Sequence, residues 1–511
     1  MFDFDLIIIG AGINGAGVAR DAAMRGLKVL LLDKGDIGGG TSSWSTRLIH
    51  GGLRYLEHGE FGLVRESLRE RETLLRIAPH LVRPLPLLIP IYQHASRGRL
   101  MLRLGMIAYD LLSFDKTLPS HKMLSRADAL NSAPELNKEG LVGAALYHDA
   151  QVEFAERLTL ENALAAQEHG ASVLTYSRVE KFRRDGNQLN VVEIVDELTG
   201  SRQQATGAMI INAGGPWVDR ILDNNDAAQR LIGGTKGSHL IVPPLPGAPE
   251  TAVYVEAKTD KRPFFIIPWN GKYLIGTTDI RFDGNLDNVR IDAKEIDYLL
   301  RETNGIFPGL KLRRDQILYT YSGVRPLPFA NKEEQSITRR HFIRSHPHYK
   351  NLFSIVGGKL TTYRSLAEEI VDLVFKELGR TSPPCLTARE PLSAPANPIR
   401  TSPLTARLSR IYGSRGDAIR ELIKEDAALG EIFDPESGGV AAEVVYAFRY
   451  EFARTLADCL LRRTMVGLNS ALGVGADEAA AKIGLQFLGW TNERALDEVQ
   501  RYRRFVDRFR V

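Results

Sequence analysis

Two short apolar runs near the N-terminus flank a glycine-rich segment and a stretch of helical character. Residues 6–9 are continuously apolar and predict a buried strand, and residues 28–32 predict a second strand that ends at Asp33. Between them, residues 18–25 are compatible with a helix whose small alanines can pack against a sheet. The order of strand, turn, helix and strand predicts a βαβ unit.

The turn in this unit has the pattern G-x-G-x-x-G, formed by Gly10, Gly12 and Gly15. In dinucleotide-binding folds the first glycine permits a tight turn, the second lets a pyrophosphate approach the backbone, and the third lets helix and strand pack closely. The N–H groups at the helix start then face the phosphates, and Asp33 is placed to accept hydrogen bonds from ribose hydroxyls. Because every part of the unit is present, the pattern favours dinucleotide binding over a glycine-rich turn in an unrelated α/β protein.

The motif alone does not choose between NAD and FAD, but the segment after it favours FAD. An NAD domain usually continues with further βα units, whereas this chain enters the loop GGGTSSWSTRLIHGG. Such a loop suits a long, permanently bound cofactor, and Thr41, Ser42 and Ser43 are placed to bond its phosphate or ribityl oxygens. A solvated linker is the alternative, and the embedded apolar residues argue against it.

The pattern then alternates between helical and β-rich stretches. Residues 154–169 predict a helix, and an apolar strand at 208–212 ends next to Gly214 and Gly215, where a ligand can approach a parallel sheet. Residues 236–279 contain short alternating runs with a hairpin signature at Asn270-Gly271, which predicts an antiparallel sheet.

Residues 352–378 repeat the order of strand, glycine turn and helix, so the chain is expected to return to its first domain. The predicted fold class is α/β, with a discontinuous Rossmann-like FAD-binding domain, an antiparallel β-sheet substrate domain and a C-terminal helical domain. The expected boundaries are 1–82, 145–230 and 320–385 for the FAD-binding domain, 83–144 and 231–319 for the substrate domain, and 400–511 for the helical domain.

Two segments each allow two interpretations. Residues 97–114 start with three arginines and continue apolar, which fits a buried helix or a basic amphipathic helix on a membrane surface. The C-terminal sequence RYRRFVDRFRV fits a solvated basic helix end or a contact with anionic lipid.

Composition narrows the class of protein further. The 511 residues carry a net charge of +4 from 66 basic and 62 acidic side chains, so no nucleic acid or other global polyanion is implied as a partner. The two cysteines allow no disulfide framework and fit a reducing compartment. The N-terminus lacks the features of a secretory signal, and no apolar run reaches the roughly 18 residues of a spanning helix. We assign no metal ligands.

Six stretches, in one order along the chain, closely resemble the FAD-dependent, membrane-associated respiratory glycerol-3-phosphate dehydrogenases. They are LIHGGLRYLE, KGSH, IPW…IGTTD, YSGVRPL, ITRR and GGKLTTYR. The resemblance implies FAD as cofactor and oxidation of sn-glycerol 3-phosphate to dihydroxyacetone phosphate by hydride transfer to FAD. Electrons would then pass to a membrane quinone. The protein would lie peripherally on the cytoplasmic face of the inner membrane, and a homodimer is one arrangement left open.

The resemblance also implies roles for six residues. Arg54 and Arg339 are candidates for a clamp on the substrate phosphate, with Tyr55 donating a hydrogen bond. His239 is the candidate general base, and Arg325 and Lys359 would each place a cation beside the reacting oxygens or the flavin. Without the resemblance, a lone histidine in a strand is more often structural, and most arginines are solvated or ion-paired.

Two glycine pairs are expected to border the flavin. Gly51-Gly52 would let the backbone lie against it, and the turn at Gly357-Gly358, with Leu360 and Thr361, would direct helix N–H groups toward it. Thr278 and Asp279 could orient polar groups nearby, but no definite role is assigned to them. The alternatives to a quinone-linked dehydrogenase are an oxidase that uses O2 and gives H2O2, and a non-catalytic flavin-binding sensor.

Overall fold

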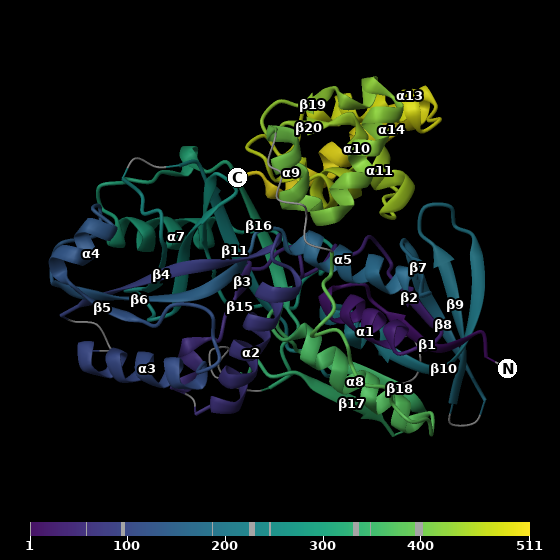
Figure 1. Ribbon diagram of the computed structural model, residues 1–511, viewed down its shortest axis with the longest axis horizontal. Helices are drawn as coiled ribbons and strands as arrows, with labels where there is room; N and C mark the ends of the chain where they lie inside the picture. Colours follow the sequence, from purple (N-terminus) through teal and green to yellow (C-terminus); the bar gives the residue numbers. More distant parts are fainter. Residues whose placement is uncertain are drawn as a thin grey trace.

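The computed structural model describes residues 2–57, 59–93, 98–185, 188–223, 230–244, 247–330, 337–347, 349–393 and 402–511. Two large sheets lie side by side, and a helical domain at the C-terminal end of the chain sits above the place where they meet (Figure 1). Arg97, at the start of one of the two ambiguous segments, lies outside the described residues.

The first sheet contains the predicted βαβ unit, with strand order β17-β18-β10-β1-β2-β7. Its central strands are parallel, and an antiparallel hairpin, β8–β9, extends from β10. The strands are β1 (Phe4–Ile9), β2 (Val29–Leu32), β7 (Ser172–Leu174), β8 (Ser177–Asp185), β9 (Gln188–Asp196), β10 (Arg202–Asn212), β17 (Phe342–His346) and β18 (Tyr349–Val356).

Both faces of this sheet are covered, because its strands are apolar on both sides. Alanines of the first helix pack on Leu6, Ile8 and Leu31, while Ile7 and Leu30 face the β8–β9 hairpin on the other side. The helices associated with this sheet are α1 (Ile13–Met24), α5 (Ala155–Glu168), α6 (Val218–Asp223) and α8 (Tyr363–Glu377). The predicted strand–turn–helix order at 352–378 is confirmed.

The second sheet has ten strands and surrounds the predicted hairpin. Asn270 and Gly271 both have positive φ, at 48° and 69°, as a type I′ turn requires. The strands are β3 (Leu48–Ile49), β4 (Val82–Tyr92), β5 (Lys122–Ser125), β6 (Leu141–Val152), β11 (Thr235–Val242), β12 (Ala252–Glu256), β13 (Pro263–Trp269), β14 (Lys272–Gly276), β15 (Ile280–Arg281) and β16 (Tyr319–Arg325).

This sheet corrects two details of the sequence-based expectation. It is mixed rather than purely antiparallel, because β12 runs parallel to β4. In addition, β6 pairs with β4 and β16 pairs with β11, so residues 145–152 and 320–325 belong to the second sheet and not to the first. Strand pairing decides sheet membership, and these partners are distant in sequence. The three-part domain division itself stays a prediction.

Four of the described helices accompany the second sheet, namely α2 (Phe61–Ile77), α3 (Arg99–Leu112), α4 (Arg126–Ser132) and α7 (Ala293–Ile306). α7 begins with a capping box between Asp292 and Glu295. α3 packs on the sheet through Leu102, Met106 and Tyr109 and is exposed on its other side. It therefore combines the two interpretations of residues 97–114, because it has one buried face and one exposed apolar face.

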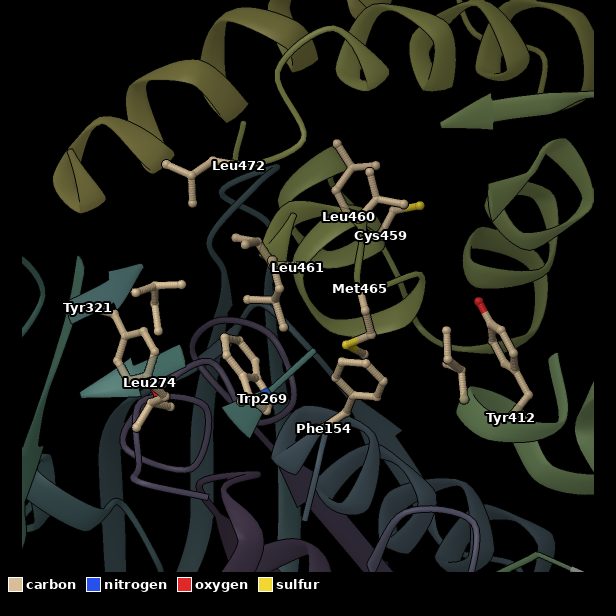
Figure 2. Close-up of a cluster of buried hydrophobic side chains, with 14 of the residues drawn as sticks. Phe154, Trp269, Leu274, Tyr321, Tyr412, Cys459, Leu460, Leu461, Met465 and Leu472 are labelled. Carbon is tan, nitrogen blue, oxygen red and sulfur yellow. The ribbon is translucent and has the colours of Figure 1, made fainter. Parts of the chain in front are cut away.

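The C-terminal domain is mostly helical, as predicted, and adds a two-stranded sheet. Figure 2 shows that Leu461 and Met465 of this domain lie against Trp269 and Phe154, so the domain shares a hydrophobic core with the body of the protein. Its main elements are α9 (Pro403–Tyr412), α10 (Gly416–Glu425), β19 (Ile432–Asp434), β20 (Gly439–Val440), α11 (Ala441–Tyr450), α12 (Leu456–Asp458), the π-turn η7 (Cys459–Arg463), α13 (Ala476–Phe487), α14 (Asn492–Val506) and the 3-10 turn η9 (Asp507–Phe509).

Candidate active site

A cavity of about 730 Å³ lies at the carboxyl edge of the first sheet, where β1, β2, β10 and β18 end. This edge is where ligands bind in open α/β sheets. Of the residues predicted to hold the cofactor, those that line the cavity are Gly10, Gly12, Asp33, Thr41, Ser42, Gly214, Gly215, Gly357, Gly358 and Leu360.

The three motif glycines occupy the positions that close backbone packing requires. Gly10 has φ +106°, and a Cβ there would lie 2.6 Å from the carbonyl oxygen of Ala213. A Cβ at Gly15 would lie 1.8 Å from the Gly10 carbonyl oxygen, so helix α1 could not pack on β1. A Cβ at Gly12 would have, among the described residues, a single close neighbour, Ser42 Oγ at 3.4 Å, which leaves the space toward the cavity open for a ligand.

Asp33 and Ser42 fix the loop around the start of α1. The carboxylate of Asp33 accepts hydrogen bonds from the backbone N–H of Ala11 (2.6 Å) and of Gly35 (2.9 Å). Ser42 Oγ accepts from the Ile13 N–H at 2.9 Å. Burial raises the pKa of Asp33. Each oxygen keeps a second lone pair, so these contacts leave room for a ligand hydroxyl at Asp33.

Several predicted cofactor residues are instead engaged with the protein itself. Ser43 is buried and donates to the Gly38 carbonyl, and Thr361 Oγ1 accepts from the His50 N–H. The Gly51 N–H donates to Tyr109 Oη at 2.9 Å, and a Cβ at Gly52 would lie 2.1 Å from the Tyr55 ring. Gly15, Ser43, Gly51, Gly52 and Thr361 do not line the cavity, so protein packing is what requires glycine at 51 and 52.

Tyr55 is influenced by four of the predicted substrate and catalytic cations: Lys359 contacts its ring, and three arginines act through their charge. Burial raises the pKa of this phenol, and the charges of Arg339, Arg325 and Arg54 lower it. The ammonium of Lys359, which also lines the cavity, lies 4.7 Å from the Tyr55 ring centre and donates to Ser67 Oγ at 2.5 Å. The structure therefore brings the predicted cationic residues together beside the cofactor cavity.

Asp279 holds two of these arginines in place. Its Oδ1 accepts from Arg325 Nη1 at 3.0 Å and its Oδ2 from Arg339 Nη2 at 2.9 Å. Burial raises the pKa of Asp279, but the two arginines outweigh it and the pKa is lowered overall. Arg325 is also fixed by Thr277 Oγ1 at 3.1 Å. One carboxylate thus orients two guanidinium groups without neutralising both.

His239 lies within the second sheet and is almost completely buried. Burial, with the charges of Arg325 and Arg47, holds its pKa well below the ordinary value, so the imidazole is neutral at physiological pH. Nε2 lies 3.0 Å from Thr46 Oγ1, and the ring centre lies 4.7 Å from that of Tyr321. Within the described part of the chain, Nδ1 is buried without a hydrogen-bond partner.

Sequence reasoning missed three parts of this region. His50 is part of the LIHGG stretch, and burial lowers its pKa to about 4, with Lys359 also lowering it. Asp279 follows the IGTT run, but only the folded structure identifies it as the bridge between two arginines. Part of the cavity wall comes from the C-terminal domain, where the sequence contains no motif.

Comparisons with known proteins agree with this arrangement. The family model of FAD dependent oxidoreductases matches residues 5–373, and the model of the C-terminal domain of alpha-glycerophosphate oxidase matches residues 357–495. The chain is 47% identical to a glycerol-3-phosphate dehydrogenase of Synechocystis sp., over 99% of this chain and 96% of that relative. It is 39% identical to D-erythritol 1-phosphate dehydrogenase of Brucella abortus, over 90% of this chain and 94% of that relative.

The fold is also similar to a solved structure. The glycerol-3-phosphate dehydrogenase of Bacillus halodurans, complexed with FAD, superposes with a TM-score of 0.79 at 28% identity, over 99% of this chain and 95% of that one. Both domain models and a full-length relative therefore point to one group. The chain belongs to the FAD-dependent oxidoreductase family, in the branch of the FAD-dependent glycerol-3-phosphate dehydrogenases.

Proposed function

We propose that this flavoprotein oxidises sn-glycerol 3-phosphate to dihydroxyacetone phosphate and passes the electrons to a membrane quinone. The observation that carries the proposal is that Asp279 holds Arg325 and Arg339 together, while Lys359 lies against Tyr55 at the cofactor cavity. The charge of Arg54 also acts on Tyr55. A phosphate ester needs such a set of cations, because charge-assisted hydrogen bonds to its oxygens are the strong ones.

FAD fits the large cavity, with its pyrophosphate at Gly12 and its ribose at Asp33. The turn at Gly357-Gly358 would border the flavin end, because it adjoins Lys359 and the cationic cluster. Asn14 supports a polar ligand here. Its Nδ2 donates to the Gly357 carbonyl at 3.3 Å, and among the described residues its Oδ1 is buried with no hydrogen-bond partner.

The phosphate would be held by Arg54 and Arg339, with the Tyr55 hydroxyl donating a third hydrogen bond. Since Asp279 already accepts from Arg339, a phosphate has to share this guanidinium with the carboxylate or displace it. The D-erythritol 1-phosphate dehydrogenase among the relatives fits the same logic, because both named substrates are polyol phosphates. The cations would bind the phosphate that both substrates share, and other residues would discriminate between polyols of different length.

FAD, when bound, accepts the hydride from the carbon that is oxidised. The chain must supply a group that accepts the hydroxyl proton, and His239 is our candidate because its imidazole is neutral and Nδ1 is not hydrogen-bonded within the described residues. Arg325 and Lys359 would stabilise the negative charge that develops on the oxygen. Burial lowers the pKa of Lys359 to about 8, so it remains mostly cationic at neutral pH.

A quinone acceptor requires contact with a membrane, and the exposed face of α3 suits one. Among the described helices, none combines the length and apolar content needed to cross a bilayer. On α3 and just after it, however, large apolar side chains are 60% to 77% exposed: Leu100, Met101, Leu104, Leu111 and Phe114. Monomeric proteins rarely expose such contiguous apolar surface without a binding role.

Charge argues for lipid as the occupant of this face. Arg99 and Arg103 are exposed on the same helix, and the Arg65 guanidinium lies 4.5 Å from the centre of the Phe114 ring. An apolar face bordered by arginines is suited to a bilayer with anionic headgroups. We propose that α3 rests in the interfacial region of such a bilayer, at the lower left of the molecule in Figure 1.

Turnover with separate acceptors tests the proposal. The purified holoprotein should oxidise glycerol 3-phosphate rapidly with a quinone analogue under anaerobic conditions, and should make little peroxide in air. Rapid, stoichiometric peroxide formation without quinone would instead identify an oxidase. A flavin that glycerol 3-phosphate does not reduce would contradict catalysis on this substrate and favour a non-catalytic sensor.

A further inference from the structure

The cofactor cavity has a wall that the nucleotide-binding fold does not supply. One side of the cavity is formed by the C-terminal domain, mainly by α14 and η9, with further residues from η7 and from α12 and its N-cap. These wall residues are Thr455, Ala457, Arg462, Glu498, Arg501, Tyr502, Phe505, Arg508 and Phe509. None of them belongs to the glycine motifs, and the C-terminal domain is therefore in direct contact with the space that FAD is expected to fill.

A buried ion-pair network fixes this domain to the loop that follows β2. Asp36, three residues after Asp33, accepts hydrogen bonds from Arg462 Nε at 2.5 Å and from Arg463 Nη2 at 2.7 Å. Arg462 Nη2 also donates to Asp458 Oδ1 at 2.8 Å. All four side chains are buried. Breaking a buried pair of this kind leaves an uncompensated charge, so the domain cannot leave the loop without a large penalty.

A second contact reaches the edge of the cavity near the end of β7. Tyr176, which lines the cavity, donates to Asp458 Oδ1 at 2.7 Å, and the same carboxylate belongs to the network with Arg462. Nearby, Arg454 donates to Asp196 Oδ2 at 2.6 Å. One set of charges therefore connects both the β2 loop and the β7 end to the C-terminal domain.

The η9 end of the wall, at Arg508 and Phe509, contacts several other segments of the protein. The Phe509 ring centre lies 4.9 Å from that of Trp44, another cavity residue, and the Phe509 carbonyl accepts from Thr320 Oγ1 at 3.2 Å. The Arg508 guanidinium lies 4.1 Å from the centre of the Phe505 ring and donates to the Asp287 carbonyl at 3.1 Å. Asp287 in turn accepts from Trp217 Nε1 at 3.1 Å. The wall thus joins all three domains around the cavity.

We propose that the C-terminal domain is a structural part of the cofactor site, and that its α14–η9 wall limits the escape of FAD. For FAD to leave, the contacts of Phe509 and Arg508 with the rest of the protein have to open. Because coupling between binding and docking is reciprocal, bound FAD also stabilises the docked position of the wall. The shared core in Figure 2 fits this role, since it makes the domain part of the body and not an appended module.

The rate of FAD release from the purified holoprotein tests the proposal. We would dilute wild type and variants into an excess of an apoenzyme that binds free FAD tightly, as a trap, and follow release by the change in flavin fluorescence. Phe509→Ala and Arg508→Ala should each release FAD about tenfold faster or more, which corresponds to roughly 1.4 kcal/mol or more. Release at the wild-type rate from both variants would overturn the proposal.

Two control variants separate the wall from a general effect on the domain. Phe448→Ala removes an aromatic ring that packs on Trp490, 5.1 Å between ring centres, away from the cavity. Arg503→Ala removes a charge from α14 that is paired with Asp477 and Glu478. Both should release FAD at the wild-type rate, and acceleration equal to that of Phe509→Ala would contradict a specific role of the wall.

Hydrogen exchange of the wild type gives a readout that needs no variant. Amides of residues 501–509 should exchange several-fold more slowly in the holoprotein than in protein from which FAD has been removed. Residues 476–487 of α13, which do not line the cavity, serve as the internal reference. Equal exchange of 501–509 in both forms, with protection confined to the β1–α1 turn, would overturn the proposal.

Discussion

The ammonium group of Lys359 lies 4.7 Å from the centre of the Tyr55 ring, and this pair connects the two halves of the proposed active site. Lys359 lines the cofactor cavity, whereas the charges of Arg54 and Arg339, which are expected to bind the substrate phosphate, act on Tyr55. A substrate held at Tyr55 would therefore lie directly beside the cofactor.

The pH dependence of kcat/KM should report Lys359. Burial lowers its pKa from the ordinary 10.5 to about 8, so the ammonium loses its proton as pH rises through about 8. If its positive charge stabilises the reacting oxygen, kcat/KM for glycerol 3-phosphate should fall over that range. Lys359→Arg keeps the charge and should remove the fall near pH 8. An increase through this range in wild type would instead mean that neutral Lys359 acts as a base.

Removal of a phosphate-binding arginine should weaken substrate binding more than cofactor binding. Arg54→Ala and Arg339→Ala should each raise KM about ten- to hundredfold, since a hydrogen bond to a charged group contributes roughly 1.5–3 kcal/mol. The flavin content should stay near that of wild type. Arg340→Ala, at an exposed neighbouring position, is the matched control for Arg339 and should leave KM unchanged. Loss of FAD with an unchanged KM would contradict the assignment.

Gly10→Ala should abolish FAD binding. The new Cβ would lie 2.6 Å from the Ala213 carbonyl oxygen, at a backbone φ of +106°, so the turn at the start of α1 would have to move. Gly26→Ala is the control, because Gly26 also has a positive φ, +86°, but no atom in the described part of the chain lies within 4 Å of the added Cβ. The ratio of flavin to protein absorbance measures both. Equal flavin content in the two variants would show that the turn is not part of the cofactor site.

Polar substitution of the exposed face of α3 should release the protein from lipid. Each buried leucine side chain contributes about 1.5–3 kcal/mol, so a Leu100→Ser, Leu104→Ser and Leu111→Ser triple variant should lose binding to vesicles of anionic phospholipid by at least about tenfold. The double variant Ile432→Ser and Leu496→Ser is the control, since these side chains are 63% and 66% exposed in the C-terminal domain. Flotation of vesicles measures the bound fraction. Binding of the triple variant at the wild-type level would exclude α3 as the membrane contact.

Local patterns were enough to predict the first part of the fold. The strand before Gly10, the helix after it and the acid at Asp33 all follow from adjacent residues, because a βαβ turn is a local structure. It was harder to predict which sheet each strand belongs to. β16 was assigned to the wrong sheet because its partner β11 is distant in sequence, and hydrogen-bond pairing between distant strands has no local pattern.

In the candidate site, too, the sequence predicted local motifs but not the contacts between residues that are distant in sequence. Sequence could not separate Ser42, which contacts α1 at the cavity, from Ser43, which is turned inward to the Gly38 carbonyl. It also could not identify Phe509 as a wall residue, because a phenylalanine in an amphipathic helical region is normally explained by packing alone. Asp279 had no assigned role until its contacts with Arg325 and Arg339 were visible.

Anaerobic titration of the oxidised flavin tests the central claim most directly. Glycerol 3-phosphate should reduce the flavin of wild type completely and with saturation, whereas glycerol, which lacks the phosphate, should not reduce it at comparable concentrations. The Arg54→Ala and Arg339→Ala double variant should keep its flavin but require far more glycerol 3-phosphate. If glycerol reduces wild type as well as glycerol 3-phosphate does, or if the double variant responds like wild type, the cations around Tyr55 do not bind the substrate phosphate.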